Sequence, residues 1–170
     1  INNVCEVETN QNHLVSLAID NNQSIVLRTY AAQGISVYGS DESRKALLSL
    51  ITTDSKNDPD EELKGSALRA VWPKLLNANN LFEVLTVPLR QNLFGAYSTF
   101  MDYEISEYLK AEDLIDGLQW LRENASPDKL QRHGMKLGDE IIIKAWMNHI
   151  DKNILLELAK TMHHLMTKYI

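Results

Sequence analysis

The 170-residue sequence has very little cysteine, glycine or proline. Its single thiol, Cys5, excludes an intrachain disulfide framework and a multi-thiolate zinc site, so the reducing cytoplasm is the expected compartment. Seven Gly and four Pro are too few to favour disorder or a turn-rich β-sandwich. No apolar run reaches the ~18 residues of a transmembrane helix, and no signal-peptide pattern is present. A helical globular protein without membrane contact is therefore expected.

Basic residues are also scarce. Lys and Arg number 17 against 23 Asp and Glu, which gives a net charge of −6. Nucleic-acid affinity comes largely from cations that neutralise phosphates, so this balance disfavours DNA or RNA as a partner. The arginines are too dispersed for a basic track; they are Arg28, Arg44, Arg69, Arg90, Arg122 and Arg132.

Apolar residues recur at helical spacing along the chain, and no useful stretch shows the strict alternation of a strand. In the second helix we expect Val26, Leu27, Tyr30, Ala31 and Ile35 to form the buried stripe. Ser24 is an expected N-cap, and Ser40 or Asp41 caps the next helix. Pro73 is an expected stop, and Ser126-Pro127-Asp128 an expected helix start. The expected helices are 13–19, 24–39, 41–52, 61–72, 79–85, 96–109, 113–124, 128–138, 139–150 and 153–169.

An internal echo points to a helical repeat. Leu27-Arg28 recurs as Leu68-Arg69 after 41 residues, an interval typical of two-helix repeats. Small residues after each arginine permit close helix packing, and we expect each arginine to pair with an acid near the turn between helices. The residues that define this signature are Asp20, Leu27, Arg28, Ala31, Ala32, Leu68, Arg69, Trp72 and Pro73.

The pattern D…(I/V)xLRxxAAxxI over residues 20–35 resembles HEAT repeats. The predicted fold is therefore all-α, with antiparallel helix pairs stacked as a short HEAT-like α-solenoid. Residues 1–85 are assigned to HEAT-like repeats, approximately 1–39 and 40–85. Residues 86–170 are assigned to further, less regular pairs that continue the same array.

A second resemblance covers residues 58–121. The segments DPDEELKGSALRAVWPKLL, LFEVLTVP, LFGAYSTFMDYEISEYL and DLIDGLQWL resemble a region downstream of the nucleotide-binding module in bacterial NACHT-type STAND NTPases. This resemblance implies a sensor region of a multidomain signalling or defence NTPase. A chain that starts at Ile1 rather than Met is expected to be part of a longer protein. No G-x-x-x-x-G-K-[ST] phosphate loop occurs here, so the ATPase itself would lie elsewhere.

The best candidate metal ligands are His149, His163 and His164. Adjacent histidines on a helix diverge by about 100°, and no H-E-x-x-H pattern or cysteine accompanies them, so no metal site is expected. The carboxylate pairs Asp102 with Glu104 and Asp113 with Asp116 could serve acid–base chemistry. Acids in a first helical turn stabilise the helix terminus without chemistry, and we expect that role for Asp113 and Asp116.

Aromatic residues offer a third kind of candidate surface. Tyr97, Phe100 and Met101 recur at i, i+3, i+4, the spacing of a core stripe, so core packing is expected for most aromatic residues. Trp72, just before Pro73, is expected to be a wedge between helices. The remaining aromatic candidates are Trp120, Trp146 and Tyr103.

Together these observations predict a non-catalytic binding scaffold with no cofactor. Its expected partner is a protein or another domain of the same parent chain. The alternatives are a compact helical enzyme and a HEAT-like nucleic-acid-processing domain. Either alternative requires acids, arginines and aromatic residues gathered in one cleft.

Overall fold

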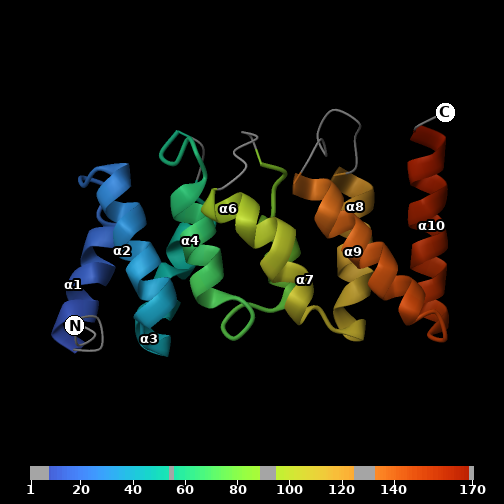
Figure 1. The fold of residues 1–170 in the computed structure, drawn as a ribbon, viewed down its shortest axis with the longest axis horizontal. Coiled ribbons are helices and arrows are strands. Elements are labelled where there is room, and N and C mark those ends of the chain that lie inside the picture. The colour runs from blue at the N-terminus through green and yellow to red at the C-terminus, as the bar shows by residue number, and fades with distance from the viewer. Residues whose placement is uncertain (1–7, 54–55, 89–94, 125–132, 169–170) are drawn as a thin grey trace. The chain divides into compact units, whose positions relative to one another are not determined.

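The computed structural model describes residues 8–53, 56–88, 95–124 and 133–168. All regular structure in these ranges is helical, which confirms the all-α prediction (Figure 1). Within those ranges no helix combines the length and the apolarity needed to cross a bilayer. The elements are α1 (Glu8–Ile19), α2 (Ile25–Tyr38), α3 (Asp41–Ala46), η2 (Leu47–Leu50), α4 (Glu62–Val71), α5 (Ala78–Val84), α6 (Ala96–Thr99), η3 (Phe100–Glu104), α7 (Ile105–Tyr108), η4 (Ala111–Asp113), α8 (Leu114–Asn124), α9 (His133–Met147) and α10 (Lys152–Lys168).

The predicted starts of α2 and α3 and the predicted end of α4 are confirmed. The Ser24 hydroxyl oxygen accepts a hydrogen bond from the Leu27 amide at 3.3 Å, and the Ser40 oxygen accepts one from the Ser43 amide at 3.2 Å. Each bond satisfies an N–H group that the first helical turn leaves unpaired. The α4 helix ends at Val71, and Trp72 is extended, as the steric restriction on a residue before proline requires.

Two predicted helices are interrupted. The helix expected over 41–52 ends at Ala46 and continues as the 3₁₀ segment η2. With three residues per turn, this segment places Leu47 and Leu50 on the same side, and both are buried. The helix expected over 96–109 is divided into α6, the π-helical turn η3 and α7.

The two helices expected over 128–138 and 139–150 form one helix from His133, which corrects the predicted stop at Gly138. The Ser126-Pro127-Asp128 start signal lies outside the described residues. A Cβ on Gly138 would lie 2.9 Å from Leu121 Cδ1 of α8. Gly138 therefore allows α9 to approach α8 closely, and its role is packing rather than helix termination.

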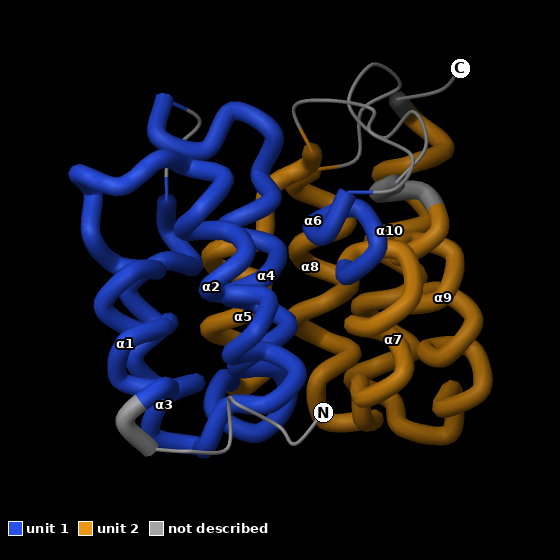
Figure 2. The backbone as a smooth tube through the Cα atoms, turned by 60° about the vertical axis from the view of Figure 1, so that its left-hand side comes forward, with its two compact units in different colours: residues 1–76, 92–100 blue, residues 77–91, 101–170 orange. Residues whose placement is uncertain are grey.

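The chain divides into two compact units, shown in Figure 2. Unit 1 comprises residues 1–76 and 92–100. Its α4 helix contacts α2, η2 and α6, and α1 packs on α2. The small residues Ala31, Ala32, Ala67 and Ala70 are all buried, as expected for close helix packing.

The buried stripe of α2 differs from the predicted one. Val26, Leu27 and Tyr30 are 59%, 40% and 66% exposed, whereas Ala31 and Ile35 are buried as predicted. The remainder of the buried face comes from small residues and from the stem of a charged residue, Arg28. The prediction ranked positions by apolarity alone and was therefore wrong for Val26, Leu27 and Tyr30.

Unit 2 comprises residues 77–91 and 101–170. Its α8 helix contacts α5, α9 and α10, and α9 also contacts α7 and α10. The boundary between the two units in the sequence lies at 76/77, and the segment 92–100 belongs to unit 1. The assignment of 1–85 and 86–170 to regular and less regular parts of one array stays a prediction. The assignment of these helices to successive HEAT-like repeats stays a prediction.

Candidate functional site

Arg28 connects the two helices of the first pair. It is 4% exposed, and its Nε donates to the carbonyl oxygen of Ala18 at 3.0 Å. The partner is therefore the last turn of α1, not the acid that the sequence predicted. Asp20 lies in the turn between the helices and accepts from the Asn22 amide at 2.9 Å. Hydrogen bonds from Asn22 and Gln23, with a smaller contribution from the charge of Arg28, lower the pKa of Asp20.

The residues that the 41-residue echo aligns lie in different environments. Leu27 is exposed and Leu68 is buried, while Arg28 is buried and Arg69 is exposed. The buried cation of α4 is instead Lys64, 5% exposed. Lys64 lies three residues before the buried Ala67, as Arg28 lies three residues before the buried Ala31. The two buried cations therefore occupy matching positions, 36 residues apart. The sequence signal for this buried cation was a lysine inside the apolar stretch LKGSALRAV.

Lys64 lies among acids at the start of α4. Its backbone amide donates to Asp58 Oδ2 at 2.8 Å, so Asp58 stabilises the first turn of α4, where Glu61 makes no side-chain cap bond. The Lys64 ammonium is 4.8 Å from the ring centre of buried Tyr97. Burial lowers the pKa of Lys64, and the negative charges of Glu61 and Asp58 oppose that shift. This cluster holds α4 and α6 together.

Most of the aromatic candidates are core residues, as predicted. Tyr97, Phe100 and Met101 are almost completely buried, and Trp72 is 9% exposed beside a cis peptide to Pro73.

In unit 2, Trp120 is also buried, and its indole N–H donates to the Leu85 carbonyl at 2.8 Å. Trp146 and Tyr103 depart from the expectation, at 62% and 61% exposed. The Tyr103 ring carries the Lys136 ammonium 3.3 Å from its centre.

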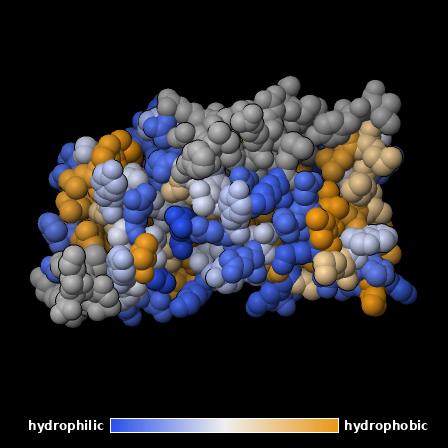
Figure 3. Space-filling view, in the orientation of Figure 1, coloured by the Kyte–Doolittle hydropathy of each residue, from blue (hydrophilic) through white to orange (hydrophobic). Residues whose placement is uncertain are grey.

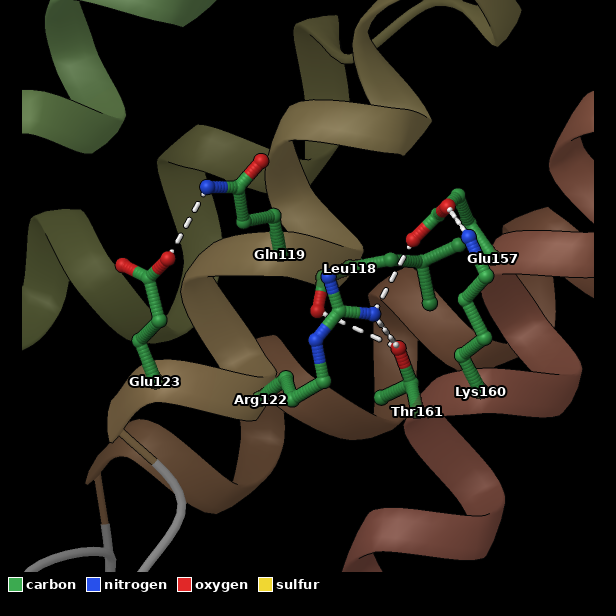
Figure 4. Close-up of polar contacts among 7 residues, drawn as sticks. All are labelled: Leu118, Gln119, Arg122, Glu123, Glu157, Lys160 and Thr161. Carbon is green, nitrogen blue, oxygen red and sulfur yellow. Dashed lines mark hydrogen bonds and ion pairs between the residues drawn. The ribbon is translucent and has the colours of Figure 1, made fainter.

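Arg122 forms the main polar connection between α8 and α10 (Figure 4). Its guanidinium contacts Glu157 Oε2 at 3.0 Å and the Thr161 hydroxyl at 3.4 Å. Thr161 in turn donates to the Leu118 carbonyl at 3.3 Å, and Lys160 also pairs with Glu157. The hydrogen bonds from Lys160 and then from Arg122 lower the pKa of Glu157. The side chains of Arg122, Glu157 and Thr161 therefore find their partners within this cluster.

The candidate acids are not gathered at one point. Asp113 Oδ2 accepts from the Lys110 amide at 2.9 Å, which is the predicted role at a helix start. Asp116 lines a hollow of about 170 Å³ on unit 2 together with Glu83 and Glu123. Asp102 and Glu104 lie in η3.

The histidines lie near the end of the chain. His149 Nδ1 is 2.8 Å from the Trp146 carbonyl, His163 is exposed and His164 is half-buried on α10. Over the described ranges, no group of three or more His, Cys, Asp or Glu is arranged to hold a metal ion. Cys5, Arg90 and Arg132 lie outside the described residues.

The feature that sequence reasoning missed is an apolar stripe on the outer face of α9. Leu137, Ile141 and Ala145 face the core of unit 2 and are fully buried. On the opposite side of α9, Ile143, Trp146 and Met147 lie at i, i+3 and i+4, and Ile150 follows in the turn after the helix; the four are 53%, 62%, 72% and 88% exposed. We call these four residues the α9 stripe. Apolar side chains gather over α9 and α10 at the right of Figure 3.

The sequence did contain a signal for the α9 stripe. The segment EIIIKAWMNHI has too many large apolar residues for one helical face. A helix buried on one side needs an apolar stripe about 100° wide, and the surplus must therefore lie elsewhere on its surface.

Comparison with known proteins found no match: no family model, no curated protein and no solved structure is significantly similar to this chain. The α9 stripe is thus the surface from which a function can be argued.

Proposed function

We propose that this chain is a non-catalytic helical scaffold that works through protein–protein contact, with the α9 stripe as its contact surface. The observation that carries the proposal is the exposure of four large apolar side chains, three on one face of α9 and one in the turn that follows it. Single exposed apolar residues are ordinary, but a contiguous set marks an interaction surface. Large aromatic and aliphatic side chains are also those that dominate binding energy at interfaces.

The area of the α9 stripe is suited to a dimer. At their observed exposures the four side chains present on the order of 500 Å² of mainly apolar surface per copy. A standard interface buries about 800 Å² on each partner, of which the centre is apolar and the rim polar. The stripe therefore supplies the centre of such an interface.

The proposed occupant of the α9 stripe is a second copy of the same helix. In an antiparallel pairing centred between Trp146 and Met147, Ile143 of one copy lies opposite Ile150 of the other. Apolar residues then meet apolar residues along the whole stripe, which is the self-complementarity that a two-fold interface requires.

The resemblance of residues 58–121 adds the cellular setting. We infer that the scaffold belongs to the cytoplasmic sensor region of a larger bacterial signalling or defence NTPase. Support for this part comes from the segments DPDEELKGSALRAVWPKLL and DLIDGLQWL, which follow the pattern of that region. Contacts of the scaffold would then regulate an activity that lies elsewhere in the parent protein.

Sedimentation velocity over a range of protein concentrations tests the contact surface. The wild-type chain is expected to form a dimer with a Kd between roughly 1 and 100 μM. The double variant Met147→Glu with Ile150→Glu places two charges in the contact and is expected to remain monomeric.

The matched control is Val37→Glu with Tyr38→Glu. These residues of α2 are 62% and 51% exposed, so the control adds the same charges at similarly exposed apolar positions. It is expected to dimerise like the wild type. A wild-type chain that stays monomeric throughout the range refutes the second copy as occupant, and association that survives the stripe variant places the contact surface elsewhere.

A further inference from the structure

A polar pocket lies beside the turn that joins α1 and α2. It has a volume of about 360 Å³ and belongs entirely to unit 1. Its polar lining comes from Asn21, Arg28, Ser49, Thr52, Thr53 and Asn57. None of the described residues that line it is acidic, in a chain where acids outnumber bases. Arg28 is therefore the one charged side chain among the described residues of this lining, beside neutral hydroxyl and amide groups.

Arg28 supplies the charge of this pocket. Arg28 is only 4% exposed, yet its only hydrogen bond to the described residues runs from Nε to the carbonyl oxygen of Ala18. Among the described residues, the two terminal nitrogens of the guanidinium have no acceptor, and neither belongs to the fully buried unpaired atoms, so they are open to the pocket that Arg28 lines. An anion in the pocket supplies charged acceptors to these N–H groups in place of water.

Among the described residues, the neighbouring negative groups offset the charge of Arg28 only in part. The carbonyl end of α1 carries only about half a negative charge, against a full positive charge on the guanidinium. Asp20 directs its oxygens to the Asn22 amide, the Asn22 side chain and the Gln23 side chain, at 2.9, 3.0 and 3.1 Å. The carboxylate of Asp20 is thus fully engaged in its own turn and does not line the pocket.

The walls of the pocket add donors of the kind that bind oxyanions. Thr52 and Asn21 are exposed at its rim, and neither side chain bonds to another described residue. The Ser49 and Thr53 hydroxyls donate to the carbonyls of Ala46 and Leu50 at 3.2 and 2.7 Å, so these two residues support the wall.

We propose that this pocket binds a small oxyanion, namely the phosphate or carboxylate group of a small molecule. The Arg28 guanidinium holds two of its oxygens through the paired N–H geometry that suits such groups. Thr52 and Asn21 bind the remaining oxygens from the rim. The site is separate from the α9 stripe, so it does not depend on the contact proposed for that surface.

Isothermal titration of the purified chain with inorganic phosphate, and separately with acetate, tests the proposal and distinguishes the two anion sources. One-to-one, saturable binding is expected for at least one of them. Thr52→Val and Asn21→Ala each remove one rim donor and keep the bond between Arg28 and Ala18. Each is expected to weaken binding about tenfold. Arg28→Gln is expected to abolish it.

Arg69→Gln is the matched control, because it removes the same charge from an exposed position on α4 of the same unit. It is expected to bind within twofold of the wild type. Circular dichroism shows which variants fold; if Arg28→Gln does not, the two rim variants decide. Absence of saturable binding to either anion overturns the proposal. So does equal affinity in the wild type and both rim variants.

Discussion

At the scale of single residues, Gly65 determines how closely α4 and α6 can approach. A Cβ at this position would lie 2.6 Å from Tyr97 Cα and 2.7 Å from the carbonyl carbon of Ala96. Both atoms belong to backbone, which cannot rotate away as a side chain can. The same contact region contains two hydrogen bonds from the Ala96 amide to the Glu62 carboxylate, at 3.1 and 3.0 Å. Gly65 is therefore required by packing and not by backbone conformation.

The first prediction compares two glycine-to-alanine substitutions in unit 1. Gly65→Ala is expected to destabilise the chain by about 3 kcal/mol, because helix α6 must move away from α4. Gly34→Ala is the control: its Cβ meets only Leu14 Cδ1 at an ordinary 3.6 Å. This change is expected to stabilise α2 by about 0.5–1 kcal/mol, since alanine is the better helix former. Urea unfolding monitored by circular dichroism measures both, and a Gly65→Ala chain as stable as the wild type contradicts the packing argument.

A second prediction concerns the buried indole of Trp120. Trp120→Phe leaves the Leu85 carbonyl without its donor and removes part of a ring that packs 6.0 Å from Phe82. The expected loss is about 2–3 kcal/mol, from an unsatisfied buried acceptor together with a small cavity. Trp146→Phe, at an exposed position, is expected to change stability by less than about 0.5 kcal/mol at dilute protein concentration. Equal losses in the two variants would show that the hydrogen bond to Leu85 contributes nothing.

At the scale of helices, the sequence predicted what local chemistry determines. The caps at Ser24 and Ser40 and the stop before Pro73 depend on neighbouring residues alone, and all three are confirmed. Gly138 was wrong as a stop, because its role depends on Leu121 of another helix. Similarly, Arg28 and Arg69 look alike in sequence, but tertiary packing buries only the first.

Candidate surfaces were harder to predict for the same reason. The sequence showed that α9 contains many apolar residues, but not which of them the core of unit 2 would cover. That division follows from the contacts of α9 with α7, α8 and α10. The polar pocket at Arg28 was equally hidden, since it is built from the α1–α2 turn together with η2 and the segment after it, about 30 residues later.

A third prediction tests the connection between α8 and α10 by pH. The pKa of Glu157 is lowered in the folded state by hydrogen bonds from Lys160 and Arg122. Its stabilising contribution is therefore fully present above the unfolded value of about 4.5 and is lost as the pH falls through the folded value. Glu157→Gln is expected to flatten the decrease in thermal midpoint between about pH 5 and pH 3.

The matched control for that experiment is Glu123→Gln on α8, which removes an exposed carboxylate that accepts from Gln119 at 2.9 Å. The thermal midpoint of this control is expected to fall at acid pH as much as that of the wild type. If Glu157→Gln and the wild type lose stability in parallel, the ion pair with Arg122 does not couple the two helices.

At the scale of the whole molecule, the buried charges balance one another. Arg28 and Lys64 are buried, but Asp58 and Glu61 are buried too, and Arg122 pairs with Glu157. Among the described residues these cations and acids therefore cancel. The surplus of acids in the net charge of −6 is left to the surface that an approaching polyanion meets.

The last prediction follows from this distribution and discriminates between the scaffold and a nucleic-acid-processing domain. Fluorescence anisotropy with a short labelled DNA duplex is expected to show no saturable binding, even at ~0.05 M salt, where phosphate contacts are strongest. A real DNA-binding surface would give micromolar affinity that falls steeply with salt, because each cation–phosphate contact releases a counterion. A small phosphate group can still enter the pocket at Arg28, since one buried guanidinium suffices for it. A duplex requires a continuous basic face several phosphates long, and in this chain 23 acids outnumber 17 Lys and Arg. Binding that weakens tenfold or more between about 0.05 and 0.2 M salt would therefore contradict both this charge distribution and the scaffold proposal.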